Sequence, residues 1–374
     1  MFDFPITEVN IWCTLYCLIM YITLLCSNYH LAIDRAYSIN IHAKNKKIAI
    51  GLVAIFIICH CLQGDFFHML QAVKEYDPTP NAYNYGEPFY VALGLFLQKN
   101  YLLFRTVVFG GAFLLFCLTS HRLGIPIYNA AFILLASYIV LFAYSRATLA
   151  MAVYYFGLSF LCRPSKNLKW LWYLVGIAII LLSRNFHNSA VIMVIATLAI
   201  FIPYNKITVL GVLIMTPFLL AIFQDNFLSI MQSGDLGEDI TAKFDTYMEL
   251  EREGIGLSGY LINTLMYCSF YIPLAIISYC LFKSNFKTHN DILRLYKVMI
   301  LLMYISILFT FMGDAFNVYV YRILFMTMIP IILITYRLYK SGNMSRKQFL
   351  WCIRPGIYYN LIKYVYSLYC LIVV

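Results

Sequence analysis

The stretch GYLINTLMYCSFYIPLAIISYCLF, residues 259–282, runs for 24 residues without one charged side chain. A helix that crosses a lipid bilayer needs about 20 consecutive apolar residues. This stretch therefore predicts a transmembrane helix, and similar stretches recur along the chain on both sides of it.

The composition of the whole chain extends this prediction. Of its 374 residues, 62% are hydrophobic and 12% are charged, with a mean hydropathy of +0.77. Soluble domains carry about a quarter of their residues as charged side chains, so a soluble enzyme and a disordered chain are both excluded. We predict an all-α polytopic membrane protein in which residues 1–374 form a single integral membrane domain.

About 12 transmembrane helices fit the apolar pattern at the length that a bilayer requires. A shorter apolar segment, 88–97, is expected to form a half-helix or a re-entrant piece. The predicted spans are residues 9–32, 48–63, 101–119, 125–143, 146–162, 170–183, 189–203, 207–223, 259–282, 293–312, 319–338 and 356–374.

The distribution of charge predicts the orientation. With the N-terminus outside, 18 of the 27 Lys and Arg residues fall in cytoplasmic connections, together with only two acids, Asp34 and Asp291. Cytoplasmic loops of membrane proteins carry an excess of Lys and Arg. The long segments 64–100, which contains the half-helix, and 225–258, which is acidic, are therefore expected to lie outside.

No metal or cofactor site is indicated by the sequence. The eleven cysteines fall mostly in apolar runs and show neither CxxC pairs nor the spacing of metal ligands, so they are interpreted as small buried hydrophobic residues. The positive net charge of +10 is explained by topology, and no nucleic-acid partner is expected.

Four arginines depart from the charge rule, because Arg105, Arg146, Arg184 and Arg322 lie within spans or at their outer ends. Arg146 opens the segment SRATLAMAV, where the positive end of a helix dipole and a guanidinium favour the same ligand, a phosphate or pyrophosphate. The alternative is an arginine that reaches the membrane interface from a helix end.

Candidate proton acceptors lie near these arginines in the predicted topology. In SRNFHNSAVIM, residues 183–193, His187 lies between Arg184 and a predicted helix start; the alternative is an ordinary capped hairpin. Asp65 follows the second span, and Glu87 precedes a proline at a predicted helix start. Each of these two carboxylates is either a general base or an ordinary interfacial or helix-start residue.

Six short motifs follow one another along the chain: QGDFFHML at 63–70, EPFYVALGLF at 87–96, SRATLAMAV at 145–153, CRPSKNLKWLWYL at 162–174, FHNSAVIM at 186–193 and YRILFMTMIPIIL at 321–333. In their order and spacing they resemble the EpsG family of exopolysaccharide polymerases, which are related in role to the Wzy O-antigen polymerases. The chain lacks the family's usual glutamine after the arginine, where Ala147 stands, and it reads GD at Asp65 where the family reads GTD.

The resemblance implies a GT-C-like membrane glycosyltransferase architecture in the bacterial cytoplasmic membrane, with the active site facing outside. It implies polymerisation of polyprenyl-diphosphate-linked oligosaccharide repeat units without a cofactor or metal. Membrane lipids, a chain-length regulator and a flippase are the further expected partners. Two alternatives remain open at this stage, a lipid-linked oligosaccharide flippase or other transporter and an O-antigen-type glycan ligase.

Site residues are assigned within this implied reaction. Arg146, Arg184 and Arg322 are expected to bind the pyrophosphate and to stabilise the charge that develops on it. His187, Asp65 or Glu87 is expected to take the proton of the acceptor hydroxyl, with His187 and Asp65 preferred over Glu87.

Overall fold

The structure, a computed structural model, describes residues 6–33, 89, 92–93, 96–97, 101–144, 147–164, 167–187, 190–203, 211, 214–215, 218, 257–284, 290–311 and 317–373. All regular secondary structure in these residues is helical, as predicted. The helices are α1 (Ile6–Ile33), α5 (Tyr101–Arg122), α6 (Ile127–Tyr144), α7 (Ala147–Cys162), α8 (Lys169–Leu182), η1 (Ser183–Asn185), α9 (Ala190–Ala196), η2 (Thr197–Phe201), α12 (Leu257–Lys283), α13 (Asn290–Phe311), α14 (Asn317–Met326), α15 (Met328–Lys340) and α16 (Arg346–Val373).

Among the residues that the structure describes, two helices are long and apolar enough to cross a membrane, within Leu261–Lys283 and Asn290–Thr310. A third span results if α14 and α15 are counted together, and several shorter apolar helices accompany them. The predicted span 48–63 lies outside the described residues, as do most of the predicted span 207–223 and most of the segments 64–100 and 225–258. The count of twelve spans therefore stays a prediction.

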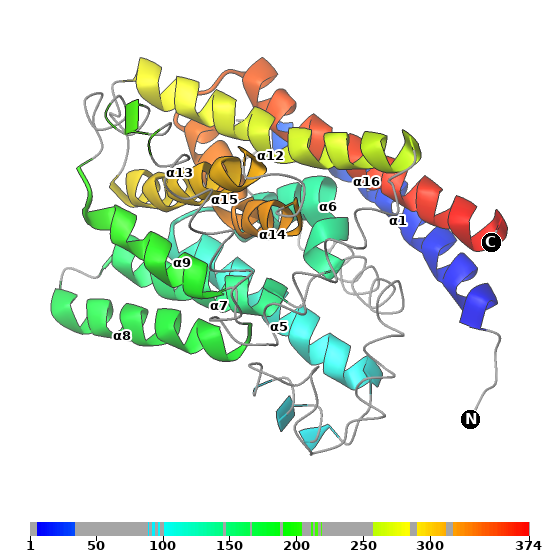
Figure 1. Cartoon of the computed structure of the whole chain (residues 1–374), viewed down its shortest axis with the longest axis horizontal. Coiled ribbons are helices and arrows are strands. Elements are labelled where there is room, and N and C mark those ends of the chain that lie inside the picture. The colour runs from blue at the N-terminus through cyan, green and yellow to red at the C-terminus, as the bar shows by residue number, and fades with distance from the viewer. Residues whose placement is uncertain are drawn as a thin grey trace.

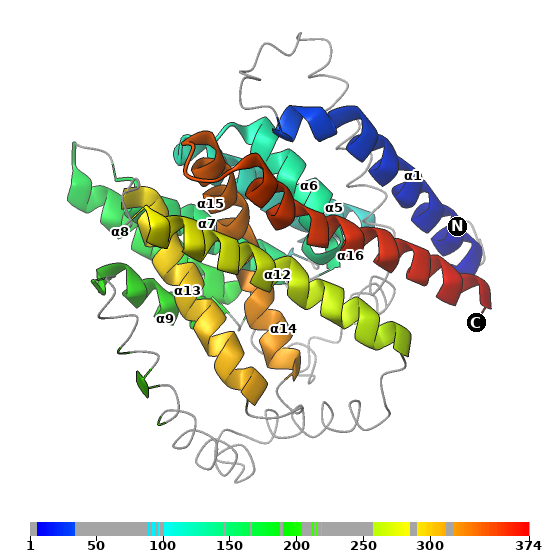
Figure 2. The same cartoon turned by 90° about the horizontal axis from the view of Figure 1, so that it is seen from above.

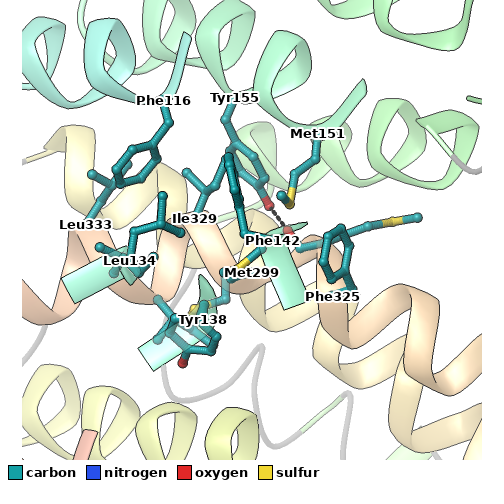
Figure 3. Packing of buried hydrophobic residues seen from close by; sticks show 14 of the residues in the cluster. Phe116, Leu134, Tyr138, Phe142, Met151, Tyr155, Met299, Phe325, Ile329 and Leu333 are labelled. Atoms are coloured by element: carbon teal, nitrogen blue, oxygen red, sulfur yellow. Dashed lines mark hydrogen bonds between the residues drawn. The ribbon is translucent and has the colours of Figure 1, made fainter. Parts of the chain in front are cut away.

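α7 is the central helix of the described bundle (Figure 1). Every residue of α7 except Phe156 is buried, and α5, α8 and α13 all pack on it. A helix that is hydrophobic on all sides belongs inside a bundle. Figure 3 shows Met151 and Tyr155 of α7 within this core, together with Phe142 of α6 and Phe325 of α14.

The first and last described helices lie side by side on one flank. α1 and α16 run together, and α12 follows along the other side of α16 (Figure 2). Glycine allows close contact with α6, because a Cβ on Gly356 of α16 would overlap the carbonyl oxygen of Ser137.

α8 also approaches its neighbour through glycine. A Cβ on Gly157 of α7 would lie 2.9 Å from the carbonyl oxygen of Gly176, and a Cβ on Gly176 would lie 2.9 Å from that of Gly157. Small residues of this kind let membrane helices pack backbone against backbone. This contact fixes α8 against α7 and therefore determines the position along α7 at which α8 ends.

The predicted continuous span 319–338 is broken in the structure. α14 and α15 meet at an angle of 42°, and Pro330 lies in the first turn of α15. Proline has no N–H for the carbonyl four residues earlier, which here belongs to Met326. The buried hydroxyl of Tyr155 donates to this carbonyl instead, at 2.7 Å (Figure 3).

The same replacement occurs in α12. Pro273 lies inside this helix and leaves the carbonyl of Ser269 without its usual donor. The buried hydroxyl of Tyr138, on α6, donates to that carbonyl at 2.7 Å. Two buried tyrosines thus satisfy the carbonyls that Pro330 and Pro273 leave without a donor, as the low-dielectric interior of a membrane protein requires.

Candidate functional site

The start of α7 is tied to the end of α6. The hydroxyl of Thr148 donates to the carbonyl of Phe142 at 2.8 Å, and both residues are buried. This hydrogen bond joins the described residues on either side of Arg146, which itself lies outside them. We call the end of the bundle where α7 begins at Ala147 and α8 ends at Leu182 the site end.

Arg184 lies at the site end. It is exposed and belongs to η1, which directly follows α8 and packs against α7. A helix rises about 1.5 Å per residue, so Arg184 lies roughly 12 Å beyond Gly176 and Ala147 about 15 Å beyond Gly157 in the same direction. Because Gly157 and Gly176 are in contact, Arg184 lies level with the first turn of α7, next in sequence to Arg146.

The segment containing His187 meets the short apolar segment 88–97. The ring of Phe89 packs against the ring of Phe186 at a tilt of 51°, with 4.1 Å between the centroids, and Phe186 is buried. His187 follows at once and is half-buried, and its carbonyl accepts the N–H of Ala190 at the start of α9 at 3.0 Å. Two segments that are about 100 residues apart in the sequence are thereby joined beside His187.

Arg322 is half-buried on α14. The hydrogen bond from Tyr155 to Met326 fixes the height of α14 against α7. Arg322 precedes Met326 by one helical turn, and Met151 precedes Tyr155 by one turn. α7 and the α14–α15 pair run in the same direction, so Arg322 lies towards the site end.

The described residues therefore place Arg184, His187 and Arg322 towards one end of the bundle. Asp65 and Glu87 lie outside the described residues, as does Arg146. In the part of the chain that the structure describes, no cluster of three His, Cys, Asp or Glu side chains is placed to hold a metal ion. The chemistry that this end offers is cationic, because guanidinium groups donate paired N–H groups to phosphate oxygens.

Two features of this region were absent from the sequence prediction. The contact between the rings of Phe89 and Phe186 joins segments distant in the sequence, and no local pattern indicates it. The hydrogen bond between Tyr155 and Met326 had a signal in Pro330, because a proline within a predicted span requires another donor.

A comparison with known protein families identifies a match. The EpsG family matches residues 52–371, a range that contains every predicted site residue. No curated protein and no solved structure matches the chain. The match covers most of the chain, and the chain belongs to the EpsG family.

Proposed function

We propose that this chain is a membrane glycosyltransferase that polymerises polyprenyl-diphosphate-linked oligosaccharide repeat units into a surface polysaccharide. Membership of the EpsG family supports an exopolysaccharide polymerase. The observation that carries the proposal further is the position of Arg184 beside the first turn of α7, with His187 three residues later. A cationic site at one end of a bundle fits a diphosphate held at one membrane surface.

The proposed reaction forms one bond and breaks one. The oxygen of an acceptor hydroxyl bonds to the anomeric carbon of the donor glycan, and the bond from that carbon to the diphosphate oxygen breaks. The polyprenyl diphosphate leaves with the bonding electron pair, and Arg146, Arg184 and Arg322 stabilise its charge. His187, Asp65 or Glu87 takes the proton of the hydroxyl.

The proposal includes about 12 membrane spans, each as long as a bilayer requires. These spans form a GT-C-like architecture in the bacterial cytoplasmic membrane. The site end faces outside. Contacts at the opposite end support this orientation, because cations from four helices or their flanks gather there. Five cationic side chains donate to backbone carbonyls at this end, those of Arg122, Arg163, Arg294, Lys297 and Arg337. An excess of Lys and Arg is typical of the cytoplasmic side.

Chain-length analysis of the polysaccharide from cells tests the proposal. Arg184→Ala is expected to abolish polymer while lipid-linked single repeats accumulate, because donor binding is lost and repeat synthesis continues. Arg346→Ala is the matched control, since Arg346 is an exposed cation at the start of α16. Normal chain lengths in Arg184→Ala cells would contradict the proposed role of Arg184.

A further inference from the structure

Three arginines from different helices gather around the turn between α5 and α6. Arg122 ends α5, Arg163 follows α7, and Arg337 lies in the last turn of α15. Terminal nitrogens of Arg163 and Arg337 both lie within 4 Å of the point where a Cβ on Gly124 would be placed. We call Arg122, Arg163 and Arg337 the arginine bracket.

Carbonyl contacts connect the members of the arginine bracket. Arg122 donates to the carbonyl of Arg163 at 3.1 Å, and Arg163 donates to the carbonyl of Arg122 at 3.3 Å. Arg337 donates to the carbonyl of Gly124 at 3.2 Å. Each guanidinium has five N–H donors, and among the described residues these contacts use one donor nitrogen of each arginine.

Aromatic stacking fixes the guanidinium plane of Arg122. Its central carbon lies 3.7 Å from the ring centroid of Phe160 and 4.8 Å from that of Trp172. A stacked guanidinium holds its N–H groups in a defined plane, which lowers the entropy that a ligand must remove on binding. The arginine bracket is thus partly organised before any ligand arrives.

The positive charge of the arginine bracket has no acidic partner among the described residues. None of its three members forms an ion pair there, and the Nε atoms of Arg122 and Arg337 are buried without a hydrogen-bond partner. Burial, and then the charge of Arg163, lower the pKa of Arg122, which lies beyond the predicted span 101–119. An anion would relieve this repulsion.

We propose that the arginine bracket is an anion-binding site for a phosphate group. Phosphate oxygens match the paired N–H groups of several arginines, and basic pockets between membrane helices suit phospholipid headgroups. α6 begins at the same turn, so the positive end of its dipole points to the same place. The phosphate comes either from an anionic phospholipid or from a free phosphate ion.

This site lies at the opposite end of α7 from the proposed polymerase site and shares no residue with it. The two proposals therefore fail separately. Binding to the arginine bracket can be measured on the purified protein without any polymerisation assay.

The test measures the midpoint of thermal unfolding of the full-length protein in a maltoside detergent. Phosphatidylglycerol, phosphatidylcholine or sodium phosphate is titrated in, since a ligand that binds the folded state raises the midpoint. We expect phosphatidylglycerol to raise the midpoint and phosphatidylcholine not to. A rise with sodium phosphate alone would support the same site with a free ion as its ligand.

Variants assign the effect to the arginine bracket. Arg163→Gln is expected to need about tenfold more ligand, the scale of one charge-assisted hydrogen bond. Arg337→Gln, on another helix, repeats the test in case Arg163→Gln does not fold, and Lys347→Gln is the control because Lys347 is an exposed cation on α16.

Two results would overturn the proposal. One is a wild-type protein whose unfolding midpoint responds to neither phosphatidylglycerol nor sodium phosphate. The other is an equal response in the wild type, Arg163→Gln and Arg337→Gln, which would leave the three arginines as caps of helix ends and nothing more.

Discussion

Arg184 combines a charge that is unusual for its predicted position with a defined place in the fold. An exposed arginine follows directly on α8, and the glycine contact between α7 and α8 brings it level with the first turn of α7. The charge rule alone predicts few cations at this end. Its position is consistent with a role in binding the diphosphate, and substitution tests that role.

With purified protein, Arg184→Ala is expected to lower the polymerisation rate by about 10²–10³-fold, the usual cost of removing a donor to a developing anion. Arg184→Lys should recover only part of this loss, since lysine keeps the charge without the paired N–H groups. Initial rates of repeat-unit consumption provide the measurement. Equal rates for Arg184→Lys and the wild type would mean that charge alone is needed.

His187 carries the prediction about proton transfer. His187→Gln is expected to lower the maximal rate by about 10²–10⁴-fold with little change in donor affinity, because a general base acts in the chemical step. Saturation kinetics on the donor separate the two quantities. A weaker donor affinity at an unchanged maximal rate would assign His187 to binding and leave Asp65 and Glu87 as the candidate bases.

At the scale of the helix, the break between α14 and α15 depends on a proline and a tyrosine on different helices. Tyr155→Phe leaves the buried carbonyl of Met326 without its donor, at a cost of about 1–3 kcal/mol. In a Pro330→Ala background the restored N–H can serve that carbonyl, so Tyr155→Phe should cost less. Thermal unfolding of the two single variants and the double variant measures this coupling.

The second proline in a helix provides the control. Tyr138→Phe and Pro273→Ala should couple in the same way through the carbonyl of Ser269. The crossed combination of Tyr155→Phe with Pro273→Ala should be additive, because these residues share no carbonyl. An equal loss of stability from Tyr155→Phe with and without Pro330 would refute the idea that the tyrosine hydroxyl replaces the missing N–H of the proline.

The glycine contact between α7 and α8 predicts a different kind of loss. Gly157→Ala places a Cβ 2.9 Å from backbone atoms of α8, so the helices must separate and the unfolding midpoint should fall. Gly110→Ala on α5 is the matched control, since a Cβ there meets nothing within 4 Å and alanine favours a helix by about 1 kcal/mol. A similar midpoint for both variants would show that the contact is not needed.

The lengths of the apolar stretches predicted the bounds of most helices within a few residues, as for α7 and α13. The reason is that burial of apolar residues determines where these helices begin and end. The predicted helix bounds were wrong where the effect of a proline depends on the residues packed around it. The last predicted span began at 356, just after Pro355, whereas α16 begins at Arg346 and continues through that proline. Proline lacks one N–H, and whether a helix breaks there depends on tertiary packing that the sequence does not contain.

Some residues of the candidate site have a local signal in the sequence and others do not. Arg184 and Arg322 were singled out because their charges violate the rule for the predicted topology, which is a local signal. The contact between Phe89 and Phe186 and the arginine bracket depend on segments that are distant in the sequence and meet in space. Arg122, Arg163 and Arg337 were counted in the sequence only as charges that set the orientation.

At the scale of the whole molecule, the account predicts opposite exposure of the two ends of the bundle. Asn185→Cys, beside Arg184, should react in intact cells with a maleimide that cannot cross membranes. Lys347→Cys should react only after lysis. Both native side chains are exposed, and labelling is compared with the wild type because native cysteines are present. The reverse pattern would invert the proposed orientation.

The most direct test of the central claim is to incubate the purified protein with one defined polyprenyl-diphosphate-linked repeat unit and to separate the products by size. The account predicts a ladder of glycans that grows by one repeat per step, with release of polyprenyl diphosphate, and no ladder with Arg184→Ala. Movement of the intact lipid between leaflets without new bonds would contradict it and indicate a flippase. A reaction that required a second, different acceptor would contradict it and indicate a ligase.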